Sequence, residues 1–189
     1  MMPSPPRQLI VLVALAGWAG AAEPMTVEHL EVGERERSYF VEFEAYLAAP
    51  PAAVMEVLQD YGRYPELDAR VVESRIVGEQ DGRPLLFTRL HGCLGAIFCR
   101  DMDRFEQLDE GAALLVATAV SGKGDLARGR TETRVEPDGD GARVRYRTEF
   151  EPSFWMPRWM VRSAMARTLE EGTLNMFRNV EARAQEAGR

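Results

Sequence analysis

The stretch Ala48–Val77, AAPPAAVMEVLQDYGRYPELDARVVESRIV, decides how this chain folds. Its proline pair ends the segment before it, and Pro51 suits a first helical turn because the N–H that proline lacks is not needed there. The stretch therefore predicts a short helix from about Pro51, which the run GRYPELD breaks. Pro65 can begin a second short helix, and Val71–Val77, rich in β-branched residues, predicts a strand.

Alternating apolar and polar residues on both sides of this stretch predict an antiparallel meander. The Asp-Gly pairs in EQDGR (Glu79–Arg83) and EPDGDG (Glu136–Gly141) are hairpin signals. Together these patterns give about seven strands, which are Tyr39–Ala48, Val71–Val77, Pro84–His91, Phe98–Leu108, Ala112–Val120, Leu126–Val135 and Ala142–Phe150.

From about Ser153 to Ala187 the apolar residues recur with helical period, and Pro157 places the helix start close to Trp155. A long amphipathic helix and a twisted sheet must each cover an apolar face, so we expect the helix to lie on the sheet. The sequence predicts an α+β fold: a curved antiparallel sheet wrapped around a long C-terminal helix, with two short helices after the first strand. The apolar stripe of the helix comprises Trp159, Ala166, Leu169, Thr173, Met176, Phe177, Val180 and Ala184.

The opening stretch resembles the entrance of the START-like (SRPBCC), helix-grip superfamily, in particular its polyketide cyclase/dehydrase and coenzyme-Q-binding branch. The similarity lies in a helix with the pattern V..VL.D, an aromatic kink Y..YPE and an outgoing strand. The tail DGDGARVRYRTEFEPSFWMPRWMVRSAM is similar to the last hairpin, strand and proline-initiated helix of that family. Where many members carry proline after the kink, this chain has Asp68-Ala69. The residues that match at the entrance are Val54, Val57, Leu58, Asp60, Tyr61, Tyr64, Pro65 and Glu66.

The resemblance covers nearly all of Glu36–Arg183 and implies a START-like domain over residues 36–187. It also implies an apolar cavity between sheet and helix, which family members use for lipids, quinones, polyketides or steroids, and a minority for chemistry. From the residues alone a filled core remains the alternative, because an apolar stripe at helical spacing is usually core. The candidate ligand-binding residues are Tyr61, Tyr64, Phe87, Phe98, Trp155, Trp159, Arg162, Leu169, Met176 and Phe177.

The start of the last helix, SFWMPRWMVRSAM, is apolar on more than one side. Arg158 and Arg162 are interleaved with Trp155 and Trp159, a composition that suits a membrane interface. Packing against the two short helices is the alternative explanation. We expect this end to lie near the cavity and to touch a bilayer or a donor protein transiently.

The first residues are typical of an export signal. Arg7 precedes the apolar run Leu9–Trp18, and Ala19-Gly20-Ala21 fits a small-residue cleavage site. We therefore expect residues 1–21 to be a signal peptide, residues 22–35 to be loosely ordered, and the protein to be secreted across the inner membrane into the periplasm. The formal net charge of −7 argues against nucleic acid as the main partner.

The chain has two cysteines, Cys93 and Cys99, in the run LHGCLGAIFCRD. In an oxidising compartment paired cysteines usually form a disulfide, so we predict one between them. Free thiols are a second possibility. A metal site with His91 and Asp101 is a third, although the spacing matches no standard zinc arrangement.

Signals for catalysis are poor. The chain has two histidines, and no nucleophile elbow, phosphate loop or H-E-x-x-H helix occurs in it. We therefore name no catalytic residue, no metal site and no cofactor. The leading prediction is an exported binding or transfer protein for a hydrophobic small molecule or lipid. The alternatives are a cyclase/aromatase-type enzyme acting in the same cavity and a protein-interaction module with a filled core.

Overall fold

The structure, a computed structural model, describes residues 24–94, 98–155 and 158–188. Within these ranges eight strands form one antiparallel sheet in the order β1-β2-β8-β7-β6-β5-β4-β3. The elements are β1 (Thr26–Arg35), β2 (Ser38–Leu47), α1 (Pro51–Gln59), the 3-10 turn η1 (Tyr61–Arg63), α2 (Tyr64–Leu67), β3 (Val71–Gln80), β4 (Arg83–Leu94), β5 (Phe98–Glu110), β6 (Leu114–Gly124), β7 (Leu126–Asp138), β8 (Gly141–Pro152) and α3 (Arg158–Ala187).

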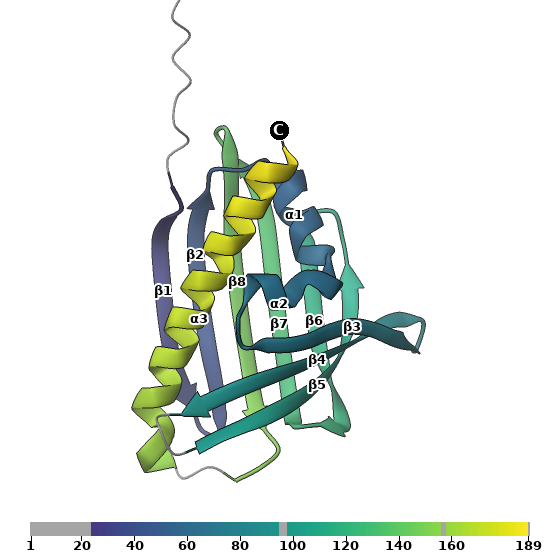
Figure 1. The fold of residues 1–189 in the computed structure, drawn as a ribbon, viewed down its shortest axis with the longest axis vertical. Helices are drawn as coiled ribbons and strands as arrows, with labels where there is room; N and C mark the ends of the chain where they lie inside the picture. The colour runs from purple at the N-terminus through teal and green to yellow at the C-terminus, as the bar shows by residue number, and fades with distance from the viewer. Residues whose placement is uncertain (1–23, 95–97, 156–157, 189) are drawn as a thin grey trace, which may run out of the picture.

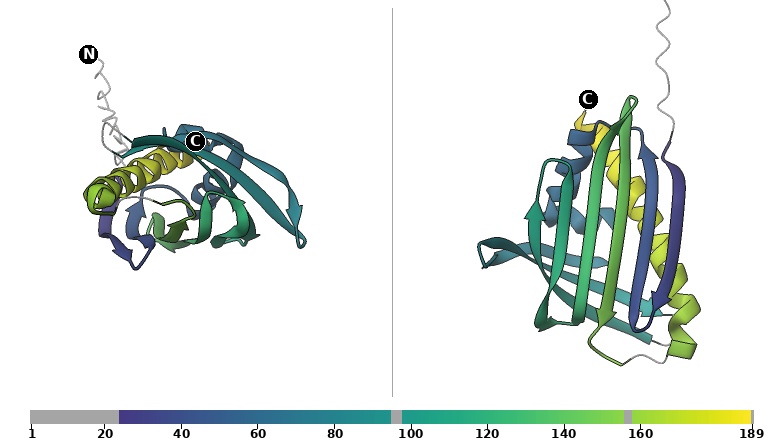
Figure 2. Two further views of the ribbon diagram at one scale, coloured as in Figure 1. Left: turned by 90° about the horizontal axis from the view of Figure 1, so that it is seen from below. Right: turned by 180° about the vertical axis from the view of Figure 1, so that it is seen from behind.

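The sheet is strongly curved, and α3 runs diagonally across its concave side (Figure 1). Viewed along the sheet, β3, β4 and β5 curl over toward the helix, while α1 and α2 close the end near the C-terminus (Figure 2). The end of β4, the start of β5 and the start of α3 lie at the opposite end (Figure 1). The predicted α+β architecture, with a sheet that grips the last helix, is confirmed.

The opening stretch folds as its prolines predict. Pro51 stands in the first turn of α1, whose buried residues are Val54, Met55 and Leu58. The chain then turns through η1 and α2, and the Tyr64 hydroxyl donates a hydrogen bond to the Leu58 carbonyl oxygen at 2.7 Å. This bond ties the aromatic kink back to α1 and directs β3 away from it.

The core forms between β2 and the apolar stripe of α3. Phe43 and Phe177 are both almost fully buried, and their rings stack with centroids 4.8 Å apart. Val180 and Ala184 continue the buried stripe toward the C-terminus, as predicted. Within the described residues no helix is both long and apolar enough to cross a membrane.

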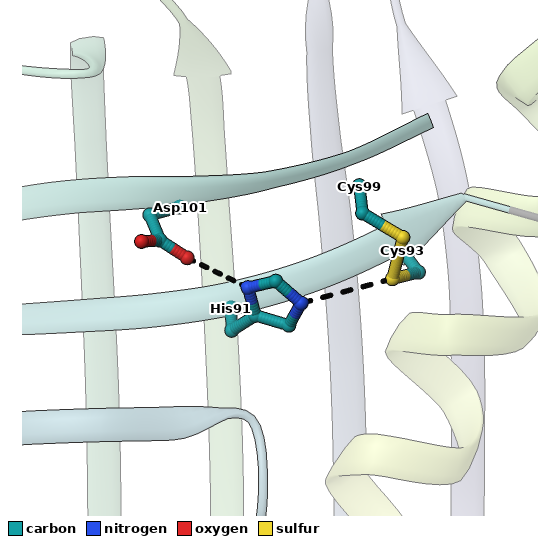
Figure 3. Close-up of a disulfide and its surroundings, with 4 residues drawn as sticks. All are labelled: His91, Cys93, Cys99 and Asp101. Atoms are coloured by element: carbon teal, nitrogen blue, oxygen red, sulfur yellow. Dashed lines mark hydrogen bonds and ion pairs between the residues drawn. A yellow bond between two sulfur atoms is a disulfide. The ribbon is translucent and has the colours of Figure 1, made fainter. Parts of the chain in front are cut away.

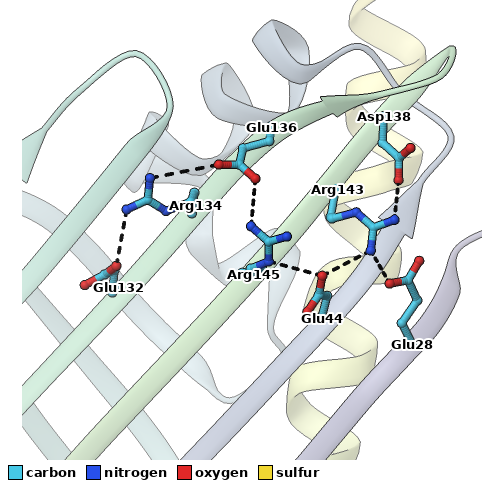
Figure 4. Close-up of polar contacts among 8 residues, drawn as sticks. All are labelled: Glu28, Glu44, Glu132, Arg134, Glu136, Asp138, Arg143 and Arg145. Atoms are coloured by element: carbon cyan, nitrogen blue, oxygen red, sulfur yellow. Dashed lines mark hydrogen bonds and ion pairs between the residues drawn. The ribbon is translucent and has the colours of Figure 1, made fainter.

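The opposite, convex face of the sheet carries a ladder of charges across β1, β2, β8 and β7 (Figure 4). Glu44 accepts hydrogen bonds from Arg143 and Arg145, each at 3.1 Å. The bond from Arg143 is the main reason why the pKa of Glu44 lies below its usual value. Because these side chains are largely solvated, the ladder keeps the outer face polar and leaves the apolar face of each strand for the core.

One expectation needs correction. Thr26–Arg35 forms β1, so the segment predicted to be loosely ordered contributes an eighth strand. It pairs antiparallel with β2, and Glu181 on α3 accepts hydrogen bonds from the main-chain N–H groups of Met25 and Ala48. An edge strand such as β1 draws its order from backbone pairing, while most of its side chains are exposed. It therefore lacks the clear apolar alternation by which the other strands were found.

Candidate functional site

A cavity of about 240 Å³ lies between the concave face of the sheet and α3. Inward-facing residues of β2 to β8 form its wall, and the part of α3 from Met165 to Met176 forms its cover. Most of the lining is apolar, and the apolar residues are Val41, Leu58, Leu67, Val71, Leu86, Leu90, Met102, Leu108, Leu115, Ala117, Phe150, Phe154, Met165, Leu169 and Met176.

An ion pair lies inside this apolar wall. Arg104 and Glu106 are two residues apart on β5, so they share its inward face, and Arg104 Nη2 lies 2.6 Å from Glu106 Oε1. Their side chains are 21% and 5% exposed. Burial disfavours the charged guanidinium, but the Glu106 carboxylate and nearby tyrosines outweigh it and hold the pKa of Arg104 above its usual value. The Nε–H group of Arg104 is buried and has no hydrogen-bond partner among the described residues.

Hydroxyl groups also line the cavity. Tyr64 and Tyr146 border the cavity, and burial raises the pKa of both phenols, so they stay protonated at neutral pH. Thr131 and Thr148 share a hydrogen bond of 2.8 Å between their hydroxyl oxygens. The cavity thus combines an apolar body with the Arg104–Glu106 pair and neutral hydroxyls, and the ion-paired Asp68 and Arg70 also border it. The threonines of the lining are Thr88, Thr131, Thr133, Thr148, Thr168 and Thr173.

The cavity reaches exposed residues near the end of β4. His91 and Cys93 border it although they are exposed. Arg100 lies over the ring of Phe154, 3.8 Å from its centroid, and Arg100 Nη2 donates to Asp125 Oδ1 at 3.0 Å. These contacts join the hairpin to the segment that leads into α3.

The same hairpin carries the disulfide between Cys93 and Cys99, the pairing that the sequence predicts. The two residues stand opposite each other in the β4–β5 register. The next outward-facing pair is His91 and Asp101, whose Nδ1 and Oδ1 atoms lie 2.7 Å apart (Figure 3). A metal site that uses the cysteines is therefore excluded while the disulfide is intact.

The residues that the sequence proposed as ligand contacts have four different outcomes. Tyr64, Leu169 and Met176 line the cavity. Tyr61, Phe87 and Phe177 are buried but outside its lining, and Trp155 is 82% exposed. The side chains of Phe98, Trp159 and Arg162 lie outside what the structure describes. A role in ligand binding stays a prediction for all ten residues.

Packing explains why Tyr61, Phe87 and Phe177 lie outside the cavity lining. Phe177 fills the space beside Phe43, and Phe87 points to the convex side of β4, where Arg75 and Arg89 lie over its ring. The hydroxyl of Tyr61 donates to a carboxylate oxygen of Glu110. Phe177 and Tyr61 thus belong to the packed core, and Phe87 packs on the outer side of the sheet.

Sequence reasoning missed the polar wall. Arg104 and Glu106 alternate with Asp103 and Phe105 on β5, so these two charged residues share the face that is opposite to Asp103. The alternation of side chains along the strand therefore already indicated that Arg104 and Glu106 face inward. Tyr146, which shares the inward face of β8 with Thr148 and Phe150, was likewise not named as a site residue.

Comparison with known proteins places the fold in a family. The model of the family "Polyketide cyclase / dehydrase and lipid transport" matches residues 40–184. The chain belongs to this family. No curated protein matches the chain.

Solved structures similar to this family member share the START-like fold. TTHA0849 from Thermus thermophilus is 20% identical, with a TM-score of 0.65 over 79% of this chain and 99% of that chain. The Zhui aromatase/cyclase from Streptomyces sp. R1128 is 18% identical, with a TM-score of 0.62 over 80% and 96%. The STAR-related lipid transfer protein from Xanthomonas axonopodis is 17% identical, with a TM-score of 0.57 over 82% and 98%. At these identities the similarity shows the fold.

Proposed function

We propose that the protein binds and carries a hydrophobic small molecule or lipid that bears an oxygen-containing polar group. The observation that carries the proposal is the apolar cavity with Arg104 and Glu106 in its wall. A buried ion pair contributes little to stability by itself, so its presence in a cavity favours a role in recognition. A ligand oxygen that reached the guanidinium would give the unpartnered donor an acceptor, whose lack costs about 1–3 kcal/mol.

The apolar wall supplies the main driving force in this proposal. Burial of ligand surface contributes about 25 cal/mol per Å² before the costs of association. A volume of about 240 Å³ is slightly below the range of typical small-molecule pockets, about 300–1,000 Å³. The cavity as described suits a compact ligand, and a larger lipid would require α3 to move outward. The open volume argues against an interaction module with a filled core.

Binding of the apolar dye ANS, which carries a sulfonate, tests the proposal. Ala117→Phe places a ring in the cavity and should weaken binding at least about tenfold, equivalent to about 1.4 kcal/mol. The matched control is Thr118→Phe, the next residue on β6, which does not line the cavity and should bind ANS as the wild type does. Native mass spectrometry of protein purified without detergent should reveal a co-purifying apolar molecule. Equal ANS binding by both variants would refute the assignment to this cavity.

We also propose that this carrier acts after export. Support comes from the apolar run before Ala19-Gly20-Ala21 and from the disulfide, which persists in oxidising compartments. Mass measurement of protein recovered from a periplasmic fraction tests it, and an uncleaved N-terminus on cytoplasmic protein would contradict it.

The exposed Trp155 supports transient membrane contact. Trp155→Ala should reduce flotation with anionic liposomes, and equal flotation would remove this part of the proposal.

A cyclase-type activity is the second candidate, and the hydroxyl-rich wall favours it. Glu106 could accept a proton from a bound substrate and Tyr146 could donate one, since both border the cavity. Glu106→Gln should then abolish turnover of a linear polyketide surrogate while ANS binding is retained. If the wild type binds the surrogate and returns it unchanged, the carrier function stands alone.

A further inference from the structure

The outward face of the β4–β5 hairpin brings four groups with metal-binding chemistry together (Figure 3). The register sets Cys93 opposite Cys99 and His91 opposite Asp101. One ligand atom from each of His91, Cys93 and Cys99 lies within 4.8 Å of the other two. The sequence offers the same four residues as one possibility, with a spacing that matches no standard zinc motif, and it is the strand pairing that makes them neighbours.

We propose that reduction of the Cys93–Cys99 disulfide converts this hairpin tip into a binding site for zinc or a similar thiolate-preferring divalent metal. A dithiol reductant supplies two electrons and two protons, the S–S bond breaks, two thiols form, and the reductant becomes a disulfide. Metal binding then displaces both thiol protons, leaving two thiolates that neutralise the dication. Both cysteines are exposed, so a reductant can reach them.

The distances fit a tetrahedral site. With Zn–S of about 2.3 Å and Zn–N of about 2.05 Å, tetrahedral angles place sulfur and nitrogen about 3.6 Å apart and two sulfurs about 3.8 Å apart. His91 Nε2 already lies 3.9 Å from Cys93 Sγ. Loss of the S–S bond lets the two sulfurs separate toward van der Waals contact, which is close to the spacing that the metal needs. The backbone of the hairpin therefore need not change its register.

Asp101 completes the site without binding the metal. Its carboxylate accepts a hydrogen bond from His91 Nδ1 at 2.7 Å, which leaves Nε2 directed toward the sulfur atoms. A carboxylate on the far nitrogen of a metal-binding histidine fixes its tautomer and increases its basicity. Three protein ligands leave a fourth position for water or a ligand oxygen.

Anaerobic titration of the full chain with Co²⁺, before and after reduction by a phosphine, tests the proposal. Reduced protein should bind one equivalent and develop thiolate-to-cobalt charge-transfer absorption, while oxidised protein should show neither. Zn²⁺ should displace the Co²⁺. Cys99→Ser should abolish the absorption, and Asp101→Asn should weaken Zn²⁺ binding about 10–100-fold, as loss of a histidine-orienting partner does elsewhere.

His29→Ala is the matched control, because His29, Glu31 and Glu42 form the other histidine-containing group in the described residues with metal-ligand spacing. It should leave binding by the reduced protein unchanged. Binding that is lost in His29→Ala, or that is equal in oxidised and reduced protein, would overturn the proposal. Loss of the β-sheet circular dichroism on reduction would also overturn it, since the site requires the β4–β5 pairing.

Discussion

Gly172 should be a glycine because Arg70 occupies the space beside it. Arg70, which directly precedes β3, reaches across to α3. Its Nη1 donates to the carbonyl oxygen of Thr168 in α3 at 2.8 Å, and its Nε donates to the nearby Asp68 carboxylate at 2.9 Å. A Cβ atom at Gly172 would overlap the guanidinium group. In the middle of α3 glycine is otherwise unfavourable, so Gly172→Ala combines loss of the Arg70 contact with a gain in helix propensity.

Two opposing effects set the change in the free energy of unfolding that Gly172→Ala causes. Displacement of the guanidinium removes hydrogen bonds made by a charged group, worth about 1.5–3 kcal/mol. Alanine in place of a mid-helix glycine returns about 1 kcal/mol. Gly172→Ala should therefore destabilise the wild type by about 0.5–2 kcal/mol. In an Arg70→Ala background the overlap is gone, and the same substitution should stabilise the protein by up to about 1 kcal/mol.

Urea unfolding of the four proteins in this double-mutant cycle, followed by circular dichroism, measures the two effects. The reversal of sign between backgrounds is the expected result. Stabilisation by Gly172→Ala in the wild type, or a coupling energy below about 0.5 kcal/mol, would refute the reasoning. Both residues border the cavity, so ANS binding by the same four proteins also shows whether the Arg70 contact shapes it.

Three further results are expected. Phe177→Ala should lower the free energy of unfolding by about 3–5 kcal/mol in urea, because a fully buried ring is removed. Tyr61→Phe, which removes the hydroxyl that donates to Glu110, should lower the midpoint of thermal unfolding by an amount equivalent to about 0.5–1.5 kcal/mol. The hydrogen bond from Arg89 holds the pKa of Asp103 below its usual value, so its stabilisation is complete above about pH 5 and is lost as the pH falls. Asp103→Asn should therefore flatten the loss of stability in acid, and equal acid profiles for the two proteins would contradict this.

The sequence predicted the fold well where local chemistry and packing agree. Prolines set the starts of α1 and α2, Asp-Gly pairs set two hairpins, and alternating residues set the faces of β2 and β8. Strand β1 was missed because its order comes from pairing with β2, which no local pattern reports. The position of the open volume was also out of reach. That position depends on which inward side chains are small. Met176 and Phe177 are both apolar and adjacent in the sequence, but of these two only Met176 borders the cavity.

The anchors of α3 favour one way for a ligand to enter. Within the described part of the chain, the hydrogen bonds that join α3 to other elements begin at Thr168, with Asn179 donating to the Leu67 carbonyl oxygen and Gln185 to the Ala48 carbonyl oxygen further on. Before Thr168, α3 packs through apolar contacts such as that of Met165. Apolar contacts are non-directional and tolerate sliding, whereas hydrogen bonds break when the helix shifts. Within the described side chains, Ser163–Arg167 should therefore move outward more easily than the part of α3 from Thr168 onward.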